Sequence, residues 1–199
     1  MKKINSKRKK VFLPKQIHSN KFYSIPKKIS NKRIKCDAII TSQKRIPIGV
    51  LTADCAPIII FDPKRMVVSM IHAGWKGAFK EIVKKVITFF KKKGSNVKDL
   101  IVVIGPCIAV KNYEIKKDFL KKFLKKDKKN KIYFKFSHNK IFFDLRKYIS
   151  FQIKSFGINK LEIINKDTFS RKNSYFSARR SLVKKENDYG RNISLIMIN

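Results

Sequence analysis

Short runs of β-branched and other apolar residues recur along this chain, and each ends at a turn signal or a polar residue. The clearest run, residues 56–61 (APIIIF), is followed by the turn sequence DPK at residues 62–64. Runs of this length predict buried strands, whereas a membrane-spanning helix needs about 20 apolar residues. The predicted strands lie at residues 37–41, 48–52, 58–61, 66–71, 100–104, 161–164 and 193–198.

Amphipathic segments alternate with these runs and are predicted helices. They lie at residues 78–93, 115–124 and 145–156. In the first of them, apolar residues recur at helical spacing and lysines fill the other face. Its last turn is rich in lysine and is followed by Gly94, as expected for a helix C-terminus.

The order of these elements predicts the fold class. Residues 132–136 and 141–143 are typical of a hairpin, and residues 166–190 are polar and predicted to be irregular. We therefore predict an α+β fold, a mixed-sheet α/β sandwich with one core. A single compact domain is expected over residues 11–199, after a basic N-terminal arm at residues 1–10.

The charge of the chain is extreme, with 49 Lys+Arg against 13 Asp+Glu and a net charge of +36. Most of these cations are lysines, whereas proteins that read nucleic acid rely on bidentate arginine contacts. Lys, Ile, Asn and Phe share A/T-rich codons, so codon bias explains the composition without a partner. We expect salt-sensitive binding to anions but no specific nucleic acid, no membrane association and a cytoplasmic location.

The three cysteines, Cys36, Cys55 and Cys107, are far apart and form no C-x-x-C pair. Their number and spacing argue against a disulfide framework and against a structural zinc ribbon. A single thiolate that acts as a metal ligand or as a nucleophile remains compatible with the sequence.

Three segments place a reactive side chain where a predicted strand ends and the backbone turns. They are residues 16–19 with His18, residues 52–57 with Cys55, and residues 72–77 with His72. Loops held by a rigid scaffold are where functional sites usually lie. These three side chains are therefore the first candidates for a functional site.

The second and third segments resemble a known family. Thr-Ala-Asp-Cys-Ala-Pro at residues 52–57 and His-Ala-Gly-Trp-Lys-Gly at residues 72–77 are similar to motifs of the laccase-domain purine nucleoside phosphorylase family, earlier labelled multicopper polyphenol oxidases. Further segments match the family in order, at residues 16–18, 105–108, 113–114, 175–180 and 190–191. The resemblance therefore runs from about residue 14 to the C-terminus.

This resemblance implies a metal ion held by His18, Cys55 and His72, and the metal is generally taken to be zinc. Two imidazoles and one thiolate suit Zn²⁺, and three protein ligands leave one position open for water or substrate. Copper is the weaker expectation, because a blue-copper centre also needs a weak axial ligand. Met66 and Met70 lie within the strand before His72 and show no such pattern.

The resemblance also implies phosphorolysis of adenosine, inosine and methylthioadenosine, and adenosine deamination in addition. The implied partners are purine nucleosides and phosphate. Cys55 and His72 would be catalytic as well as metal-binding, because a zinc-bound water is acidic enough to act as a nucleophile. Asp54, beside the metal cysteine, is expected to handle a proton or to orient a ligand.

Phosphorolysis requires a phosphate site, and three cations are candidates for it. Arg179 and Arg180 carry guanidinium forks that fit phosphate oxygens. Lys76 and the N-terminus of the helix expected after Gly77 offer a second anion site.

Other functions stay open at this point. Some bacterial members of the family are described as peptidoglycan editing factors, and Cys55 and His72 could then be nucleophile and base on a cell-wall precursor. A copper polyphenol oxidase follows the older family label. A basic protein that coats nucleic acid would show salt-dependent binding and need no metal.

The chain departs from the family pattern in three places. The family usually has a longer segment before its Gln-x-His motif, so we expect part of the sheet and substrate pocket to be missing before Gln16. Asp167 stands where a cysteine is common, and Ala109 replaces a glycine. The implied metal ligands are retained, but substrate preference is less firmly implied.

Overall fold

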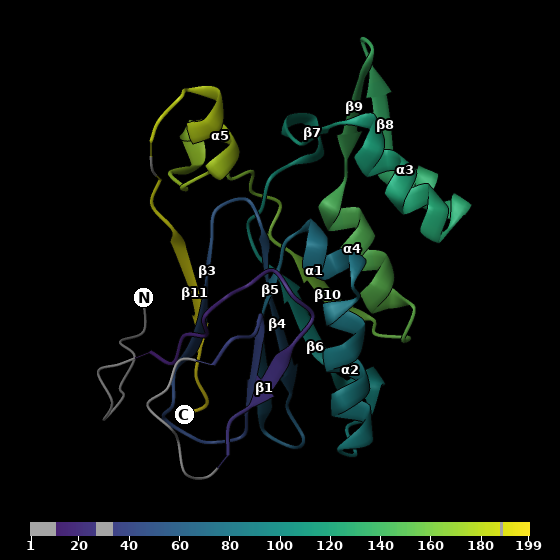
Figure 1. The fold of residues 1–199 in the computed structure, drawn as a ribbon. Helices are drawn as coiled ribbons and strands as arrows, with labels where there is room; N and C mark the ends of the chain where they lie inside the picture. The colour runs from purple at the N-terminus through teal and green to yellow at the C-terminus, as the bar shows by residue number, and fades with distance from the viewer. Residues whose placement is uncertain (1–10, 27–33, 188) are drawn as a thin grey trace.

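Six strands form the central sheet of the molecule (Figure 1). They are β1 Phe22–Ser24, β2 Ala38–Thr41, β4 Ala56–Asp62, β5 Val67–Ala73, β6 Ile101–Ile104 and β10 Lys160–Ile163. Their order is β1-β2-β5-β4-β6-β10. The four central strands pair antiparallel and the two edge strands pair parallel, so the sheet is mixed.

The computed structural model describes residues 11–26, 34–187 and 189–199. The basic arm that the sequence predicts at residues 1–10 lies outside the described residues.

Both faces of the sheet are buried, which explains why its strands are nearly continuous apolar runs. Successive side chains of a strand point to opposite faces. Ile58 and Ile60 of β4 and Ile71 of β5 therefore pack into one core, whereas Ile59 and Met70 contribute to a second core on the opposite face. The two cores are the two layers of the sandwich.

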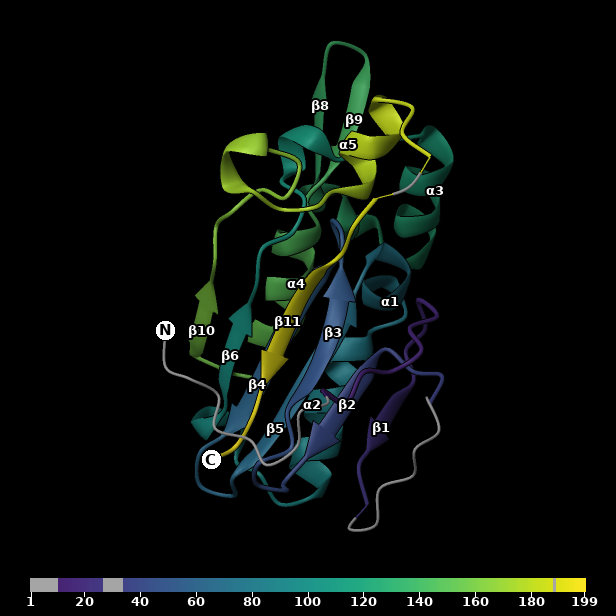
Figure 2. The same cartoon turned by 90° about the vertical axis from the view of Figure 1, so that its left-hand side faces the viewer.

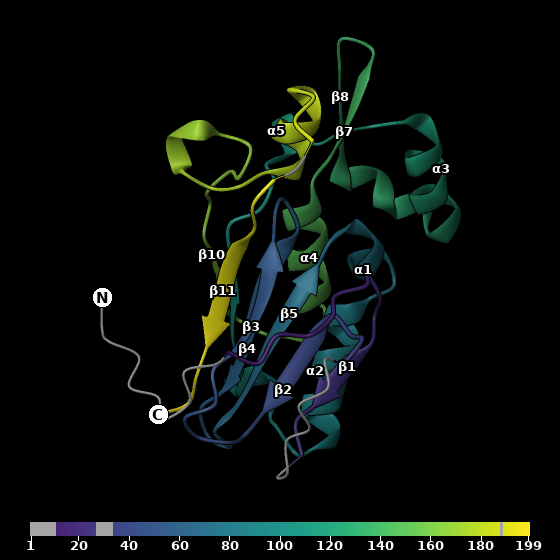
Figure 3. The ribbon, with the colours of Figure 1, turned by 60° about the vertical axis from the view of Figure 1, so that its left-hand side comes forward.

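Helices cover one face and a small second sheet covers the other. The helices are α1 Trp75–Phe79, α2 Ile82–Lys92 and α4 Leu145–Lys154, which lie together in Figures 1 and 3. The second sheet consists of β3 Ile48–Thr52 and β11 Asn192–Ile196, paired antiparallel in front of the central sheet in Figure 2. No helix in the described part of the chain is long and apolar enough to cross a membrane.

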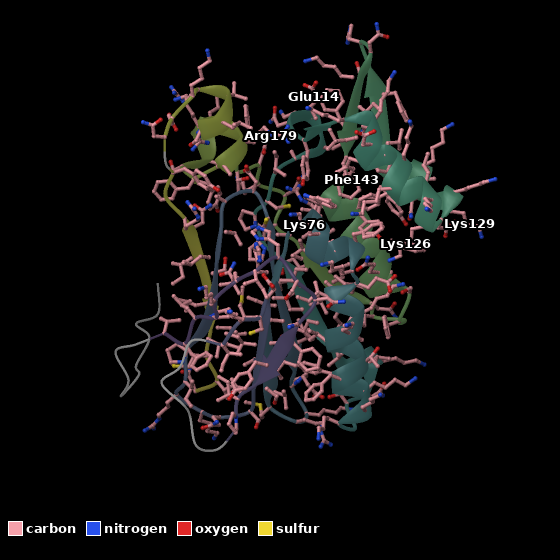
Figure 4. All side chains as sticks on the ribbon, in the orientation of Figure 1. Lys76, Glu114, Lys126, Lys129, Phe143 and Arg179 are labelled. Carbon is pink, nitrogen blue, oxygen red and sulfur yellow. The ribbon has the colours of Figure 1, made fainter. Side chains whose placement is uncertain are left out.

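A three-stranded sheet and a helix extend the helical side beyond the end of the central sheet. They are β7 Glu114–Ile115, β8 Phe134–Ser137, β9 Lys140–Phe143 and α3 Lys117–Lys126. Tilted ring contacts join this part to α4, and Phe143 (labelled in Figure 4) takes part in them. The remaining helices are α5 Ala178–Val183 and the 3-10 helices Val97–Asp99, Val110–Asn112, Lys128–Tyr133 and Arg171–Asn173.

The predicted fold class is confirmed, and two predicted elements need correction. The helix expected over residues 78–93 is two helices, because Glu81 adopts a left-handed backbone conformation between them (φ 63°) and breaks the helical path. The segment 166–190 is not irregular throughout, since it contains α5. That helix has only six residues, and Leu182 and Val183 on it are exposed, so no apolar periodicity marks it.

Candidate metal centre

Cys55 and His72 lie at the same end of the central sheet because β4 and β5 pair antiparallel. Ala56 at the start of β4 pairs with Ala73 at the end of β5. Cys55 directly precedes Ala56, and His72 directly precedes Ala73. The register therefore places Cys55 and His72 close together at the same end of the sheet. His18 reaches the same end from the loop before β1.

The three side chains form a compact group. Their ligand atoms all lie within 4.8 Å of one another. The rings of His18 and His72 meet edge to face, with centroids 4.8 Å apart and planes at 79°. His72 is buried, Cys55 is half-buried and His18 is exposed, so the group is open on the His18 side. The structure thus brings together the three residues that the sequence singled out.

A buried carboxylate that sequence reasoning missed contacts two of these residues. Asp37 is fully buried, and its Oδ1 lies 2.9 Å from Nδ1 of His72 and accepts a hydrogen bond from the His18 backbone N–H at 3.0 Å. It also accepts hydrogen bonds from the backbone of Ile17 and from both the backbone and the hydroxyl of Ser19. An Asp directly before a buried strand was the available signal, but only the register identifies its partner.

The pKa values in the group follow from burial and from these contacts. Burial raises the pKa of Asp37, but hydrogen bonds from His72 and Ser19 lower it to about 2. Burial raises the pKa of Cys55, but its hydrogen bonds with both imidazoles lower it to about 7. Burial lowers the pKa of His72, but hydrogen bonds with Asp37 and Cys55 raise it to about 9. In the absence of a metal, the contact between Cys55 and His72 therefore lowers the pKa of the thiol and raises that of the imidazole, so ionisation of one group favours that of the other.

Gly74 leaves the space that the thiol of Cys55 occupies. A Cβ atom at position 74 would lie 2.6 Å from Sγ of Cys55 and 3.4 Å from Cδ2 of His18. The backbone of Gly74 (φ −76°, ψ 174°) is one that any residue adopts, so the glycine is required for space and not for conformation. The close approach of the backbone fixes where the sulfur can lie.

The donor set fits a transition metal. Nδ1 of His72 faces Asp37, which leaves Nε2 for a metal, and such carboxylate–histidine pairs are typical of zinc sites. The thiol of Cys55 already has a lowered pKa, and the thiolate is the form that binds metal. Among the His, Cys, Asp and Glu side chains that the structure describes, no fourth one joins the group. Three ligands are typical of catalytic zinc, which keeps one position open.

Asp54 is next to Cys55 in the chain, but its carboxylate is used elsewhere. Oδ1 accepts a hydrogen bond from the Thr168 hydroxyl at 2.7 Å, and Oδ2 accepts one from the backbone N–H of Arg179 at 2.6 Å. Asp54 therefore ties the cysteine loop to the start of α5. This placement fits the orienting role expected for Asp54 better than the proton-handling role.

The three predicted phosphate-binding cations have different surroundings. The guanidinium of Arg180 donates hydrogen bonds to the carbonyls of Thr168, Phe169 and Tyr175 at 2.6 to 3.0 Å. Arg180 therefore holds the loop before α5, and its predicted contact with phosphate stays a prediction. These three bonds use three of the five N–H donors of the guanidinium, so fewer donors remain for a phosphate than in a free arginine side chain.

The helix near Lys76 begins earlier than the sequence predicted. Lys76 is exposed on α1, and its Nζ lies 5.8 Å from the ring centroid of Trp75 (Figure 4). The helix begins at Trp75, so Gly77 lies inside α1 and no helix N-terminus follows it before Ile82. The backbone after Gly77 therefore does not form the anion site expected at a helix N-terminus. Lys76 remains a candidate for phosphate binding through its side chain alone.

Arg179 is the predicted cation that lines a cavity together with Cys55. A cavity of about 210 Å³ beside Cys55 is lined by Tyr113, Arg179 and Leu182, among others. The same three residues line a second cavity of about 500 Å³, which extends to Trp75. Drug-sized ligands occupy pockets of about 300–1,000 Å³. The two cavities together therefore offer enough room for a nucleoside.

The guanidinium of Arg179 is held by contacts that leave most of its donors available. It lies 5.4 Å from the ring centroid of Tyr113, and its Nη1 donates a hydrogen bond to the carbonyl of Glu114 at 2.8 Å (Figure 4). Sequence reasoning placed Tyr113 in a segment that resembles the family but gave it no role. Burial raises its pKa, so its hydroxyl stays protonated at the rim of the cavity.

We expect metal-free protein to react with iodoacetamide at Cys55 alone, with a rate that is half-maximal near its pKa of about 7. Burial raises the pKa of Cys36 to about 11 and also raises that of Cys107, so both should stay unmodified. Mass spectrometry of labelled peptides over a pH series measures the three rates separately. Equal reactivity of the three thiols would contradict the assigned environments.

Two comparisons with solved structures agree with the fold described above. YfiH of Bacillus licheniformis, described as a hypothetical protein, superposes with a TM-score of 0.82 and is 24% identical, covering 95% of this chain and 74% of its own. YlmD from Geobacillus stearothermophilus gives a TM-score of 0.83 at 18% identity, covering 94% and 73%. Both likenesses concern the fold alone.

Sequence comparisons are more specific. A Rickettsia conorii protein named purine nucleoside phosphorylase is 34% identical over 180 residues, which are 89% of this chain and 73% of the relative. A Borreliella burgdorferi protein of the same name is 32% identical over 153 residues, which are 76% and 66% of the two chains. The model of the family described as multi-copper polyphenol oxidoreductase laccase matches residues 1–199. This chain therefore belongs to the multi-copper polyphenol oxidoreductase laccase family.

Proposed function

We propose that this chain is a zinc-dependent purine nucleoside phosphorylase that acts on adenosine, inosine and methylthioadenosine, with adenosine deamination as a second activity of the same site. The observation that carries the proposal is the convergence of His18, Cys55 and His72 beside a cavity lined by Arg179. The names of the relatives from Rickettsia conorii and Borreliella burgdorferi support the reaction class.

The donor set favours zinc over the copper in the family's description. Two imidazoles and a thiolate are common zinc ligands, and a blue-copper centre would add a weak axial ligand such as a methionine. Met70 is buried in the second core, and Met66 is exposed in the turn before β5. Neither position supports an axial ligand, so copper is the alternative metal.

Different residues of this chain would bind the metal and the phosphate in the proposed reaction. His18, Cys55 and His72 would hold the metal, which when bound supplies a Lewis acid and an acidified water. In phosphorolysis, an oxygen of phosphate bonds to C1′ of the ribose, the C1′–N9 bond breaks, and the base leaves with a proton. Arg179 supplies the cation that binds the phosphate dianion beside the sugar.

The aromatic residues of the larger cavity suit the purine. Trp75 and Tyr113 line it and present flat surfaces on which a base can stack. Leu182 lines both cavities and adds an apolar wall between the metal centre and this aromatic part. The purine would therefore lie toward Trp75, with the ribose and phosphate nearer Arg179 and Cys55.

The direct test is release of adenine from adenosine by the purified protein, with and without phosphate. We expect adenine and ribose 1-phosphate only when phosphate is present, and inosine and ammonia from deamination in either condition. Protein that holds its metal but releases no base from adenosine, inosine or methylthioadenosine would contradict the proposed function.

The geometry also favours a second candidate, in which a cysteine nucleophile hydrolyses a cell-wall precursor. Cys55, His72 and Asp37 are linked by hydrogen bonds in the order nucleophile, base and orienting acid. His18 separates the two candidates. His18→Ala removes a ligand from the metal centre and should abolish phosphorolysis, whereas a Cys55–His72 nucleophile should keep activity on peptidoglycan precursors after this change.

We expect Arg179→Ala to raise the KM for phosphate about 10- to 100-fold, the loss of one charged hydrogen bond worth about 1.5–3 kcal/mol. The bond from its backbone N–H to Asp54 is retained in this variant, so α5 should keep its place. Steady-state kinetics at varied phosphate measures the effect. Arg171→Ala is the matched control, because Arg171 lines a cavity on the other side of α5. An unchanged KM in Arg179→Ala would remove Arg179 from the phosphate site.

A further inference from the structure

We propose that Asp37 is the positioning residue of this centre, a single buried carboxylate that holds His18 and His72 in the arrangement that binds the metal. The inference rests on the proposed metal site and extends it to a residue outside the ligand set. Asp37 touches neither substrate nor metal in this proposal, and it acts only through the two histidines.

The sheet register delivers Asp37 to this position. Ala38 pairs with Ile71, so Asp37, directly before β2, lies opposite His72 near the end of β5. The backbone repeats the contact, because the N–H of His72 donates a hydrogen bond to the carbonyl of Asp37 at 2.7 Å. The side chain of Asp37 is fully buried, so it has no competing solvent.

On the His72 side, the carboxylate selects the tautomer of the ring. With Oδ1 of Asp37 at 2.9 Å, Nδ1 of His72 carries the proton and donates it to the carboxylate. The lone pair is then on Nε2, the ring nitrogen that does not face Asp37. A carboxylate behind a metal-binding histidine also raises its basicity and fixes the orientation of its ring.

On the His18 side, the carboxylate organises the backbone. The N–H groups of Ile17, His18 and Ser19 all donate to it at 2.6 to 3.3 Å, and the hydroxyl of Ser19 adds a bond at 2.7 Å. Successive N–H groups that converge on one anion form a nest, which fixes a local backbone path. His18 itself has a φ of 54°, a conformation that a non-glycine residue adopts only when its surroundings hold it there.

An asparagine cannot replace this carboxylate, although it has the same shape. Its amide offers one oxygen and one NH₂ group, whereas every partner of Asp37 donates a hydrogen bond. If the NH₂ faces His72, Nδ1 must accept and the proton moves to Nε2, which blocks metal binding. If the NH₂ faces Ser19, two donors oppose each other and the loop with His18 shifts. Either orientation of the amide therefore disturbs one ligand.

The test is Co²⁺ binding by metal-free protein, followed by the cobalt absorption bands and by zinc competition against a chelator. We expect Asp37→Asn to weaken the zinc affinity about 10- to 100-fold and to alter the cobalt spectrum. Asp62→Asn is the matched control, because Asp62 is equally buried at the opposite end of β4 and accepts hydrogen bonds from a turn. It should bind both metals as the wild type does.

Ser19→Ala gives a graded second variant, since it removes one of the hydrogen bonds to Asp37 and leaves the charge in place. We expect an intermediate loss of zinc affinity in Ser19→Ala. If Asp37→Asn does not fold, the zinc affinity of Ser19→Ala tests the role of Asp37 instead. Wild-type affinity and spectrum in a folded Asp37→Asn, or unchanged zinc affinity in Ser19→Ala, would overturn the proposal. These readouts need no substrate, so they are independent of whether phosphorolysis is observed.

Discussion

Replacing His72 by alanine should abolish metal binding and adenine release together. The variant removes one of the three metal ligands. The loss of metal affinity should therefore exceed the 10- to 100-fold that is typical when a hydrogen-bond partner of a ligand is removed. It also removes one donor to the buried carboxylate of Asp37, which should lower the free energy of unfolding by about 1–3 kcal/mol. Elemental analysis, a nucleoside assay and a thermal melt measure the three effects.

The matched control is His138→Ala. His138 lies in the exposed turn of the β8–β9 hairpin, away from the central sheet, so metal content and activity should remain at wild-type levels. Adenine release at the wild-type rate by His72→Ala would contradict the proposed role of the metal centre, whatever the effect on stability.

The second large effect is expected from Gly74→Ala, which leaves all three ligands in the chain. The added Cβ would lie 2.6 Å from Sγ of Cys55, so the sulfur must move away from its place between the two histidines. Overpacking of this kind costs about 1–3 kcal/mol. We expect a loss of metal affinity of about 10- to 100-fold, which corresponds to about 1.4–2.8 kcal/mol.

A double variant separates this clash from other effects of the alanine. In a Cys55→Ala background there is no sulfur at the contact, so adding Gly74→Ala should leave the melting temperature of the metal-free protein nearly unchanged. In the wild-type background the same change should lower it. Equal destabilisation in both backgrounds would mean that the glycine is needed for another reason.

Most of the fold could be predicted from the sequence because strand and helix patterns are local. The apolar run in β4 and the helical spacing in α2 come from residues close together in the chain. The break at Glu81 was missed because its positive φ has no signal in residue type. The helix α5 was missed because it is short and its Leu182 is exposed. Its apolar residues therefore do not recur at the spacing of a buried helix face.

The site was predictable only in part, for a related reason. His18, Cys55 and His72 each stand in a motif, so the resemblance identified them. Asp37 has no motif of its own here, and its importance depends on the register between β2 and β5. Arg180 shows the opposite case, since its sequence position suggests phosphate binding while its guanidinium binds three backbone carbonyls.

The most direct measurement is elemental analysis of the purified wild-type protein beside Cys55→Ala. We expect about one zinc ion per wild-type chain and essentially none in the variant, because the thiolate is the only anionic ligand in the group. Copper in place of zinc would show that the metal was assigned wrongly and would favour the alternative function of a copper polyphenol oxidase. A wild-type chain without metal, or a Cys55→Ala chain that keeps its full share, would contradict the metal centre itself.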